Sequence, residues 1–250
     1  MSAIASVIRA IAAAISFLTR IPLGRLRLDS LDVGRGSLFF PFVGAGIGAL
    51  VGLVAEGLTG LVGAFLAASV AVVFEALLTG AIHFDALADA ADGLGAWSRE
   101  RALEVMRDPS IGTFGALTLL LDVLAKVGAI ASLTNGGNAV WPVLAAFALG
   151  RAAPLALGLA LPYARPGSGS GRALTDGSLW ARAGGLVLAA ATAAFTVGWS
   201  ALALGAAAAG VVLLVGGVAR LRLGGVTGDV LGAGTELATT GALLAAVAIA

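Results

Sequence analysis

Long uncharged hydrophobic stretches recur along nearly the whole chain. A helix that crosses the hydrocarbon core of a bilayer needs about 20 mostly apolar residues, and several of these stretches meet that requirement. We predict about seven spanning helices, at residues 39–58, 61–82, 111–134, 140–161, 184–200, 201–219 and from about 231 to the C-terminus. The pattern therefore predicts an all-α, polytopic integral membrane helical bundle that forms a single domain over residues 1–250.

Polar and small residues inside the stretches indicate where the spans end and how they pack. Glu56 and Glu75 each interrupt one of the first two spans, and a Gly-rich break near Gly60 separates them. The charge-free run 183–219 is too long for one helix, so we expect a turn near residues 199–200. Glycines four residues apart in the first span suit close contact between helices in lipid. They are Gly44, Gly48 and Gly52.

The N-terminal segment, residues 1–36, differs from the spans because it contains several arginines. The apolar stretch between Arg9 and Arg20 is about ten residues long, which is too short to span a bilayer. No small-residue cleavage site precedes a mature domain, so the pattern also disfavours a signal peptide. We predict an N-terminal helix that lies at the membrane interface.

The cationic residues are distributed unevenly between the loops. If the spans alternate in direction, thirteen of the fifteen Lys and Arg residues fall on one side. These thirteen lie in the segments 1–36, 83–110, 162–182 and 220–230. By the positive-inside rule that side faces the cytoplasm, so we expect a multi-pass protein of the bacterial inner membrane with its active face cytoplasmic.

The overall composition narrows the function further. The chain is 59% hydrophobic and 12% charged, its mean hydropathy is +1.03, and its formal net charge is +1. Such a small net charge gives no basis for nucleic-acid binding. The chain has no Cys and one His, which excludes disulfides, thiol nucleophiles and zinc sites built from Cys and His clusters.

The densest polar motif is HFDALADAADG at residues 83–93. In a helix, Asp85, Asp89 and Asp92 have the spacing i, i+4, i+7 and share one face, while Ala and Leu occupy the other. Carboxylates are costly at the bilayer centre, so we place the motif at the cytoplasmic interface. Three such oxygen donors suit Mg²⁺ or Mn²⁺, and His83 is either a general base or a hydrogen-bonded interfacial side chain.

The segment after this motif supplies further candidates. Residues 97–107 form an amphipathic pattern, interpreted as a helix on the membrane surface. Arg107 and Asp108 adjoin the turn at residues 109–115, where the next span begins, and are candidate substrate contacts. We expect the loop 83–110 to be the catalytic loop.

Charged residues also occur within or beside later spans. Asp122 and Lys126 are four residues apart in one span and predict an intramembrane ion pair. Arg151 either binds phosphate or extends toward the interface. The loop 224–234 lacks the Lys of a P-loop, but Asp229 and Glu236, seven residues apart, are candidate metal ligands. Three arginines of the loop 162–182 are interpreted mainly as determinants of sidedness, namely Arg165, Arg172 and Arg182.

Several motifs taken together resemble the cobalamin synthase family, adenosylcobinamide-GDP ribazoletransferase. In chain order they are FLTRIP (17–22), FFPFVGAGIG (39–48), HFDALADAADG (83–93), VMRDPSIGTFG (105–115), the region of Arg151 with LPYAR (161–165), and GGVTGDVLGA (224–233). The resemblance extends over nearly the whole chain. The chain departs from the family pattern at Ala86, where Gly is usual, and at Ser110, where a cationic residue is common.

This resemblance implies a reaction and roles for the matching residues. The phosphocobinamide group of adenosylcobinamide-GDP would pass to a ribose hydroxyl of α-ribazole or its 5′-phosphate, with release of GMP. Mg²⁺ would be bound by Asp85, Asp89 and Asp92, with Asp229 as a further candidate ligand. Arg107 and Arg151 would bind phosphate oxygens, and His83 or a spare Asp would accept the hydroxyl proton. Membrane lipid and other enzymes of nucleotide-loop assembly are further expected partners.

Two alternatives remain open from the residues alone. Asp89, Asp92 and Gly93 match the beginning of the CDP-alcohol phosphotransferase motif, but Trp97 stands where that motif has Arg, and its downstream residues are missing. A transporter would instead use charged residues within the spans, such as Asp122 and Lys126. The polar residues gather at the predicted interface, which favours an enzyme.

Overall fold

The computed structural model describes residues 3–23, 28–166 and 171–250, and this part of the chain is helical apart from loops and one isolated β-bridge. The expected all-α class is confirmed. The longer helices are α1 (Ala3–Leu18), α3 (Phe40–Val62), α4 (Ala64–Thr79), α5 (Ile82–Leu94), α7 (Thr113–Asn135), α8 (Val140–Ala160), α10 (Leu179–Val197), α11 (Ala201–Leu223) and α12 (Gly228–Ala248). The short helices are α2 (Ser30–Gly36), η1 (Ser37–Phe39), α6 (Arg99–Val105), α9 (Arg172–Thr175) and η2 (Gly198–Ser200).

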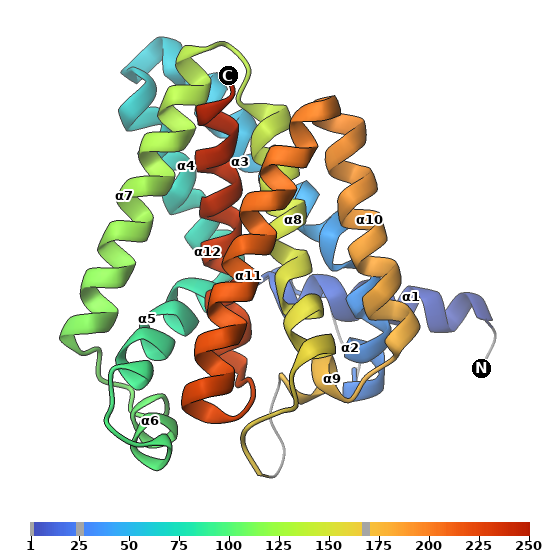
Figure 1. The fold of residues 1–250 in the computed structure, drawn as a ribbon. Helices are drawn as coiled ribbons and strands as arrows, with labels where there is room; N and C mark the ends of the chain where they lie inside the picture. Colours follow the sequence, from blue (N-terminus) through green and yellow to red (C-terminus); the bar gives the residue numbers. More distant parts are fainter. Residues whose placement is uncertain (1–2, 24–27, 167–170) are drawn as a thin grey trace.

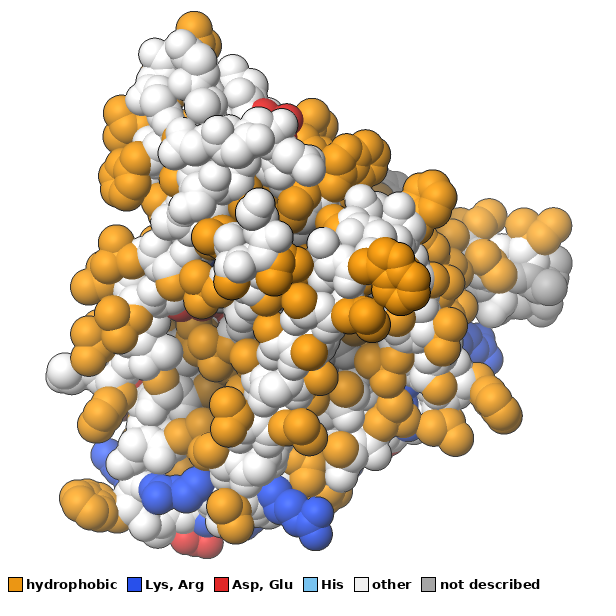
Figure 2. Space-filling model, turned by 45° about the horizontal axis from the view of Figure 1, so that its top comes forward, with side chains coloured by type: hydrophobic (Ala, Val, Ile, Leu, Met, Phe, Trp, Pro, Cys, Tyr) orange, Lys and Arg blue, Asp and Glu red, His pale blue; other side chains and the backbone are white. Residues whose placement is uncertain are grey.

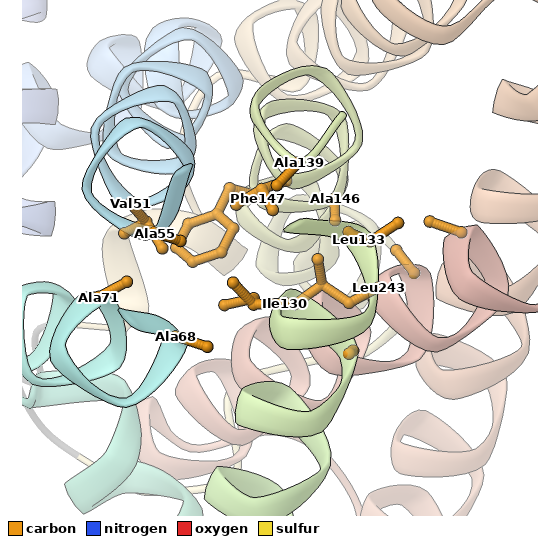
Figure 3. Close-up of a cluster of buried hydrophobic side chains, with 14 of the residues drawn as sticks. Val51, Ala55, Ala68, Ala71, Ile130, Leu133, Ala139, Ala146, Phe147 and Leu243 are labelled. Carbon is orange, nitrogen blue, oxygen red and sulfur yellow. The ribbon is translucent and has the colours of Figure 1, made fainter. Parts of the chain in front are cut away.

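Helix α8 lies in the middle of the bundle, where it packs against α3, α10, α11 and α12 (Figure 1). Helix α12 in turn contacts α5, α7 and α11. The core between these helices consists mainly of small and branched apolar side chains. Figure 3 shows part of it, where Phe147 of α8, Ile130 of α7 and Leu243 of α12 meet Val51 of α3.

The glycines of α3 allow it to approach α8 closely. A Cβ atom on Gly44 would lie 2.5 Å from the carbonyl oxygen of Phe147, and one on Gly48 would lie 2.8 Å from that of Val143. Neither distance is tolerable for a real side chain. The interpretation of these glycines as a close packing surface is therefore confirmed.

Several helices are long and apolar enough to cross a membrane. Five stretches of the described residues meet this condition, or six if the bent pair α4 and α5 forms one span. One stretch, Leu179–Leu223, has 45 residues and contains η2, after which α11 runs back beside α10 (Figure 1). The expected turn near residues 199–200 is confirmed. The protein is thus a polytopic helical membrane bundle, while the count of about seven spans stays a prediction.

The second predicted span differs most from the structure. The break between the first two spans occurs at Gly63, whose φ is +80°. Gly60, near which the break was expected, lies within α3. Helix α4 has only 16 residues and ends at Thr79, with Gly80 as its C-cap, and the chain then bends by 91° into α5. Ala81 adopts φ 56° at this bend, a conformation that L-residues rarely occupy. Because α5 leaves the direction of α4, we treat α5 as lying outside the spanning segments.

The arginine-bearing segments lie together at one end of the bundle. In Figure 1, α2, α6, α9 and the loop after α11 lie at the lower end, whereas the α7–α8 and α10–α11 connections lie at the upper end. Figure 2 shows Lys and Arg side chains along the lower edge of a mostly hydrophobic face. Helix α1 lies across the bundle axis in Figure 1, but its membrane position stays a prediction. Arg25 and Arg27 lie outside the described residues.

Candidate active site

The acidic motif forms helix α5, as its spacing predicts, and α12 packs closely against it. Ala86 of α5 and Gly232 of α12 mark the closest approach, since a Cβ on Gly232 would lie 2.4 Å from the Cβ of Ala86. This contact explains why a small residue is needed at both positions. It also brings the exposed carboxylate of Asp85 to the same region as Asp229 in the first turn of α12.

Two loops that are distant in sequence join beside α5. The N–H of Ala164 donates to the carbonyl of Val226 at 2.8 Å, and the N–H of Val226 donates to the carbonyl of Pro162 at 2.9 Å. Gly225 permits this pairing, because a Cβ there would lie 2.3 Å from the Pro162 carbonyl oxygen. The LPYAR and VTGD motifs therefore form one structural unit.

This unit places an arginine against a predicted metal ligand. Arg165 Nη2 donates to Asp229 Oδ2 at 2.8 Å, and the Thr227 hydroxyl donates to the same oxygen at 3.2 Å. Thr227 also caps α12 by accepting a hydrogen bond from the N–H of Val230. Among the residues described, all hydrogen bonds to the Asp229 carboxylate reach Oδ2, so Oδ1 is left for another ligand.

Asp92 makes a different set of contacts from the other acids of α5. Its Oδ2 accepts the N–H of Gly112 at 2.7 Å, and its Oδ1 accepts the N–H of Gly115 at 2.8 Å. These N–H groups belong to the beginning of α7, where no earlier helical carbonyl is present to accept them. Asp92 therefore caps α7 and holds the loop before α7 against α5.

Asp89 lies in a cluster of acidic side chains whose charges repel each other. Burial raises the pKa of Asp89 to about 6, and the charge of Asp85 contributes the next largest effect. Asp229 and Asp92 raise it further, whereas Arg165 lowers it. The structure thus brings together the four predicted aspartates and adds one arginine. A cation that joins this cluster would relieve the repulsion.

A cavity of about 120 Å³ adjoins the cluster. Asp85 and Asp229 line it, together with His83 and Thr235 and with apolar residues of α1, α3 and α8. His83 is buried, and its Nδ1 has no hydrogen-bond partner among the described residues. His83 therefore shares a cavity with Asp85 and Asp229.

The predicted substrate contacts on the next loop lie at the surface. Helix α6 covers Arg99–Val105, which is shorter than the expected 97–107. Arg107 and Asp108 follow it and are exposed. The backbone N–H of Ser110 donates to Asp108 at 2.9 Å, and this bond lowers the pKa of Asp108. Because Asp92 holds Gly112, this loop lies beside the C-terminal half of α5.

Two other predicted site residues lie in a buried charged network instead. Glu236 pairs with Lys126, which also lies 3.1 Å from Glu75. Arg151 is fully buried, lies 3.4 Å from Glu75, and donates to the Thr239 hydroxyl at 3.2 Å. The structure therefore does not bring Glu236 or Arg151 to the aspartate cluster, because each is held by an opposite charge from a neighbouring helix.

The predicted ion pair between Asp122 and Lys126 is wrong. The ammonium group of Lys126 contacts Glu75 of α4 and Glu236 of α12, and no ion pair with Asp122 occurs among the described residues. Asp122 is buried on the same helix as Lys126. Tertiary packing thus offers Lys126 two carboxylates that sequence spacing does not reveal.

The oxygen donors at the cluster match the chemistry of Mg²⁺. Among the described residues, no three His, Cys, Asp or Glu side chains already enclose a metal position. Mg²⁺ usually retains several waters and binds one or two carboxylates together with substrate phosphates, so it does not need such an enclosure. One or two of the carboxylates of Asp85, Asp89 and Asp229 therefore fit such an open site.

The sequence interpretation missed three arginines that organise this end of the bundle. Arg165 belongs to the site, as described above. Arg99 of α6 donates to the carbonyls of Leu223 and Ala164, both at 2.8 Å, which ties α6 to the joined loops. Arg182 is buried and donates to five carbonyls, those of Gly158, Leu174, Thr175, Gly177 and Ser178. From the sequence, these arginines indicate only which side of the membrane their loops face. The backbone carbonyls that accept from Arg99 and Arg182 leave no signal in the sequence.

Comparisons with known proteins extend over nearly the whole chain. The family model for cobalamin-5-phosphate synthase matches residues 10–247. The adenosylcobinamide-GDP ribazoletransferase of Thiobacillus denitrificans is 38% identical over 95% of this chain and 94% of its own length. The enzyme of the same name from Pseudomonas putida is 39% identical over 90% of this chain and 92% of its own. No solved structure matches.

Proposed function

The chain belongs to the cobalamin-5-phosphate synthase family, and we propose that it is a membrane-embedded adenosylcobinamide-GDP ribazoletransferase. In this reaction an oxygen of a ribose hydroxyl on α-ribazole, or on its 5′-phosphate, attacks the phosphorus that carries the cobinamide. A new P–O bond forms, and the bridging P–O bond breaks so that GMP leaves with its electron pair. The product is adenosylcobalamin or its phosphate.

The observation that carries this proposal is the acidic cluster beside the cavity at the arginine-rich end of the bundle. The cavity volume of about 120 Å³ is enough for a few waters or one phosphate group, but far too small for a corrin ring. We therefore expect the diphosphate of the donor, with its metal ion, beside Asp85 and Asp229, and the corrin and guanosine outside the cavity. A cytoplasmic location of this end fits the arginine distribution.

One or two of the carboxylates of Asp85, Asp89 and Asp229 would hold Mg²⁺, together with the diphosphate of the donor. The bound ion supplies neutralisation of the charge that develops on the leaving GMP. Asp92 stays in place as the cap of α7 and so fixes the loop that carries Arg107 and Asp108. Arg107, which is exposed on this loop, would bind the part of the diphosphate outside the cavity.

His83 is the best placed residue to accept the proton of the attacking hydroxyl. It lines the same cavity as Asp85, is buried, and has an Nδ1 atom without a partner among the described residues. A general base must lie within hydrogen-bond reach of the proton that it removes. A hydroxyl bound in the cavity would lie close enough to His83 for this transfer.

The proposal is tested with purified protein in lipid nanodiscs. We expect GMP release from adenosylcobinamide-GDP only when α-ribazole or its phosphate is present, together with a joined corrinoid product. EDTA should abolish the reaction and excess Mg²⁺ should restore it. The variant Asp85→Asn should be folded and inactive, whereas Asp176→Asn, an exposed aspartate paired with Arg172, should keep full activity.

Other outcomes would overturn the assignment. Turnover of a CDP-activated alcohol would point to the phosphotransferase alternative. GMP release without a joined product would indicate hydrolysis. Membrane transport finds less support in the structure, because Lys126 is engaged by two buried carboxylates.

A further inference from the structure

Arg165 is the described cation that directly contacts the acidic cluster. Its Nη2 atom lies 2.8 Å from Asp229, and its charge acts on Asp89. The neighbouring arginines are engaged elsewhere: Arg99 bonds two carbonyls, and Arg222 bonds the carbonyl of Ala96. Arg165 is therefore the arginine placed to meet an anion at this site.

The guanidinium of Arg165 has unused hydrogen-bonding capacity. An arginine carries five N–H donors, and Arg165 uses one of them on Asp229. Its Nε is buried and has no partner among the described residues. A buried donor without a partner is costly, so a ligand that accepts from Nε would be favoured. Phosphate oxygens match the planar fork of a guanidinium and are often bound through two donors at once.

The backbone holds Arg165 in this place from both sides. It follows directly after Ala164, whose N–H bonds Val226 and whose carbonyl accepts from Arg99. Asp229 follows three residues after Val226, so the same bridge fixes both partners of the ion pair. The side chains are 16% and 19% exposed, which leaves them accessible to a ligand from the cavity mouth.

We propose that Arg165 binds the diphosphate of the donor nucleotide and that Asp229 positions it for this role. The inference rests on the proposed function, since it names the group that recognises that substrate. Asp229 uses Oδ2 to orient Arg165, and its Oδ1 accepts no hydrogen bond from the described residues. One carboxylate thereby sets the separation between the arginine and the carboxylates Asp85 and Asp89, so that both can act on the same phosphate group.

The experiment measures ligand binding without turnover. Isothermal titration calorimetry of the protein in nanodiscs, with Mn²⁺ saturating, would follow inorganic pyrophosphate. We expect Arg165→Gln to weaken pyrophosphate binding by about tenfold or more, the loss expected for charge-assisted hydrogen bonds. Arg165→Lys keeps the charge without the fork and should lose less. Arg101→Gln, which removes an exposed arginine paired with Glu104, should bind like the wild type.

A second measurement separates diphosphate binding from a purely structural role. Electron paramagnetic resonance of Mn²⁺ alone should show that Arg165→Gln binds the ion at least as tightly as the wild type, because a positive charge has left the cluster. Steady-state kinetics should show a raised KM for adenosylcobinamide-GDP with a smaller change in kcat. Equal losses of Mn²⁺ and pyrophosphate affinity, or unchanged pyrophosphate affinity, would overturn the proposal.

Folding and the proposed function can each be judged separately in this design. Size-exclusion profiles and thermal unfolding would report whether Arg165→Gln folds, and Arg165→Lys carries the test if it does not. A wild-type protein that binds pyrophosphate through Arg165 but transfers nothing would retain the inference and reject the function. A wild-type protein that transfers, with Arg165→Lys and Arg165→Gln unaltered in KM, would retain the function and reject the inference.

Discussion

Asp92 Oδ2 accepts a hydrogen bond from the backbone N–H of Gly112 at 2.7 Å, across 20 residues of chain. Its other oxygen accepts from Gly115, so both carboxylate oxygens are used on the first turn of α7. The three aspartates of this motif, which together suggest a metal site, therefore have different roles. Asp85 lines the cavity, Asp89 lies in the acidic cluster, and Asp92 joins α5 to α7.

We predict that Asp92→Asn destabilises the α5–α7 junction, because an amide offers one acceptor oxygen where two N–H groups must be satisfied. The unsatisfied N–H should cost about 1–3 kcal/mol. Hydrogen exchange at Gly112 and Gly115 should become faster, and the thermal unfolding temperature should fall. The matched variant Asp85→Asn should leave exchange at these amides unaltered. Unchanged protection in Asp92→Asn would refute the capping role.

The close contact between α5 and α12 predicts a coupled pair. Gly232→Ala would place a Cβ 2.4 Å from that of Ala86, which should separate the helices and cost about 1–3 kcal/mol. The double variant with Ala86→Gly should recover part of that loss, because it removes the opposing methyl group. A double-mutant cycle on unfolding and on Mn²⁺ affinity would measure the coupling. Additive effects would show that the contact does not position the cluster.

The buried charges were only partly predictable from the sequence. Helical spacing correctly indicates that Asp85, Asp89 and Asp92 share a face, because they are local to one helix. Lys126 and its partner Glu236 are separated by 110 residues, and only the packing of α7 against α12 brings them together. Spacing rules favour the nearer Asp122, since they consider a single helix. In the same way, the partner of Arg165 depends on the bridge between two loops.

This network predicts a large effect at Lys126. Lys126→Met would leave Glu75 and Glu236 without their shared cation inside the bundle, and such a loss typically costs about 3–5 kcal/mol. We expect poor yield of folded protein, measured by size-exclusion chromatography after extraction. Asp122→Asn should be milder, because Lys126 keeps both partners. Equal losses in the two variants would indicate that Asp122 is part of the ion-paired network.

The raised pKa of Asp89 predicts a pH dependence of metal binding. Asp89 has a pKa of about 6 in the metal-free protein, above the usual 3.8, so it gains a proton as pH falls from 7 to 5. Protons and metal compete for the same carboxylate, and Mn²⁺ affinity should decrease by up to about tenfold per pH unit below 6. Asp89→Asn should bind Mn²⁺ weakly with a flatter pH profile. A wild-type affinity that stays constant down to pH 5 would contradict the prediction.

The raised pKa of Asp89 also predicts how the stability of the metal-free protein changes with pH. The folded state of the metal-free protein holds the Asp89 proton more tightly than the unfolded state does. The cost of the ionised carboxylate is therefore present above about pH 6 and disappears as pH falls toward 4. Thermal unfolding in EDTA should show this gain in the wild type and a smaller one in Asp89→Asn, provided that other carboxylates behave alike in both.

The arrangement of the loops predicts the sidedness of two exposed positions. Trp97 lies before α6 at the arginine-rich end, and Asn135 ends α7 at the opposite end of the bundle (Figure 1). The chain has no native cysteine, so Trp97→Cys and Asn135→Cys each introduce a single reactive thiol. In intact cells, a membrane-impermeant maleimide should label Asn135→Cys, whereas Trp97→Cys should react only after the membrane is opened. Trp97 is fully exposed, so weak labelling there cannot arise from burial. Reversed labelling would place the acidic cluster outside the cytoplasm, and labelling of both from outside would contradict the transmembrane arrangement of α7.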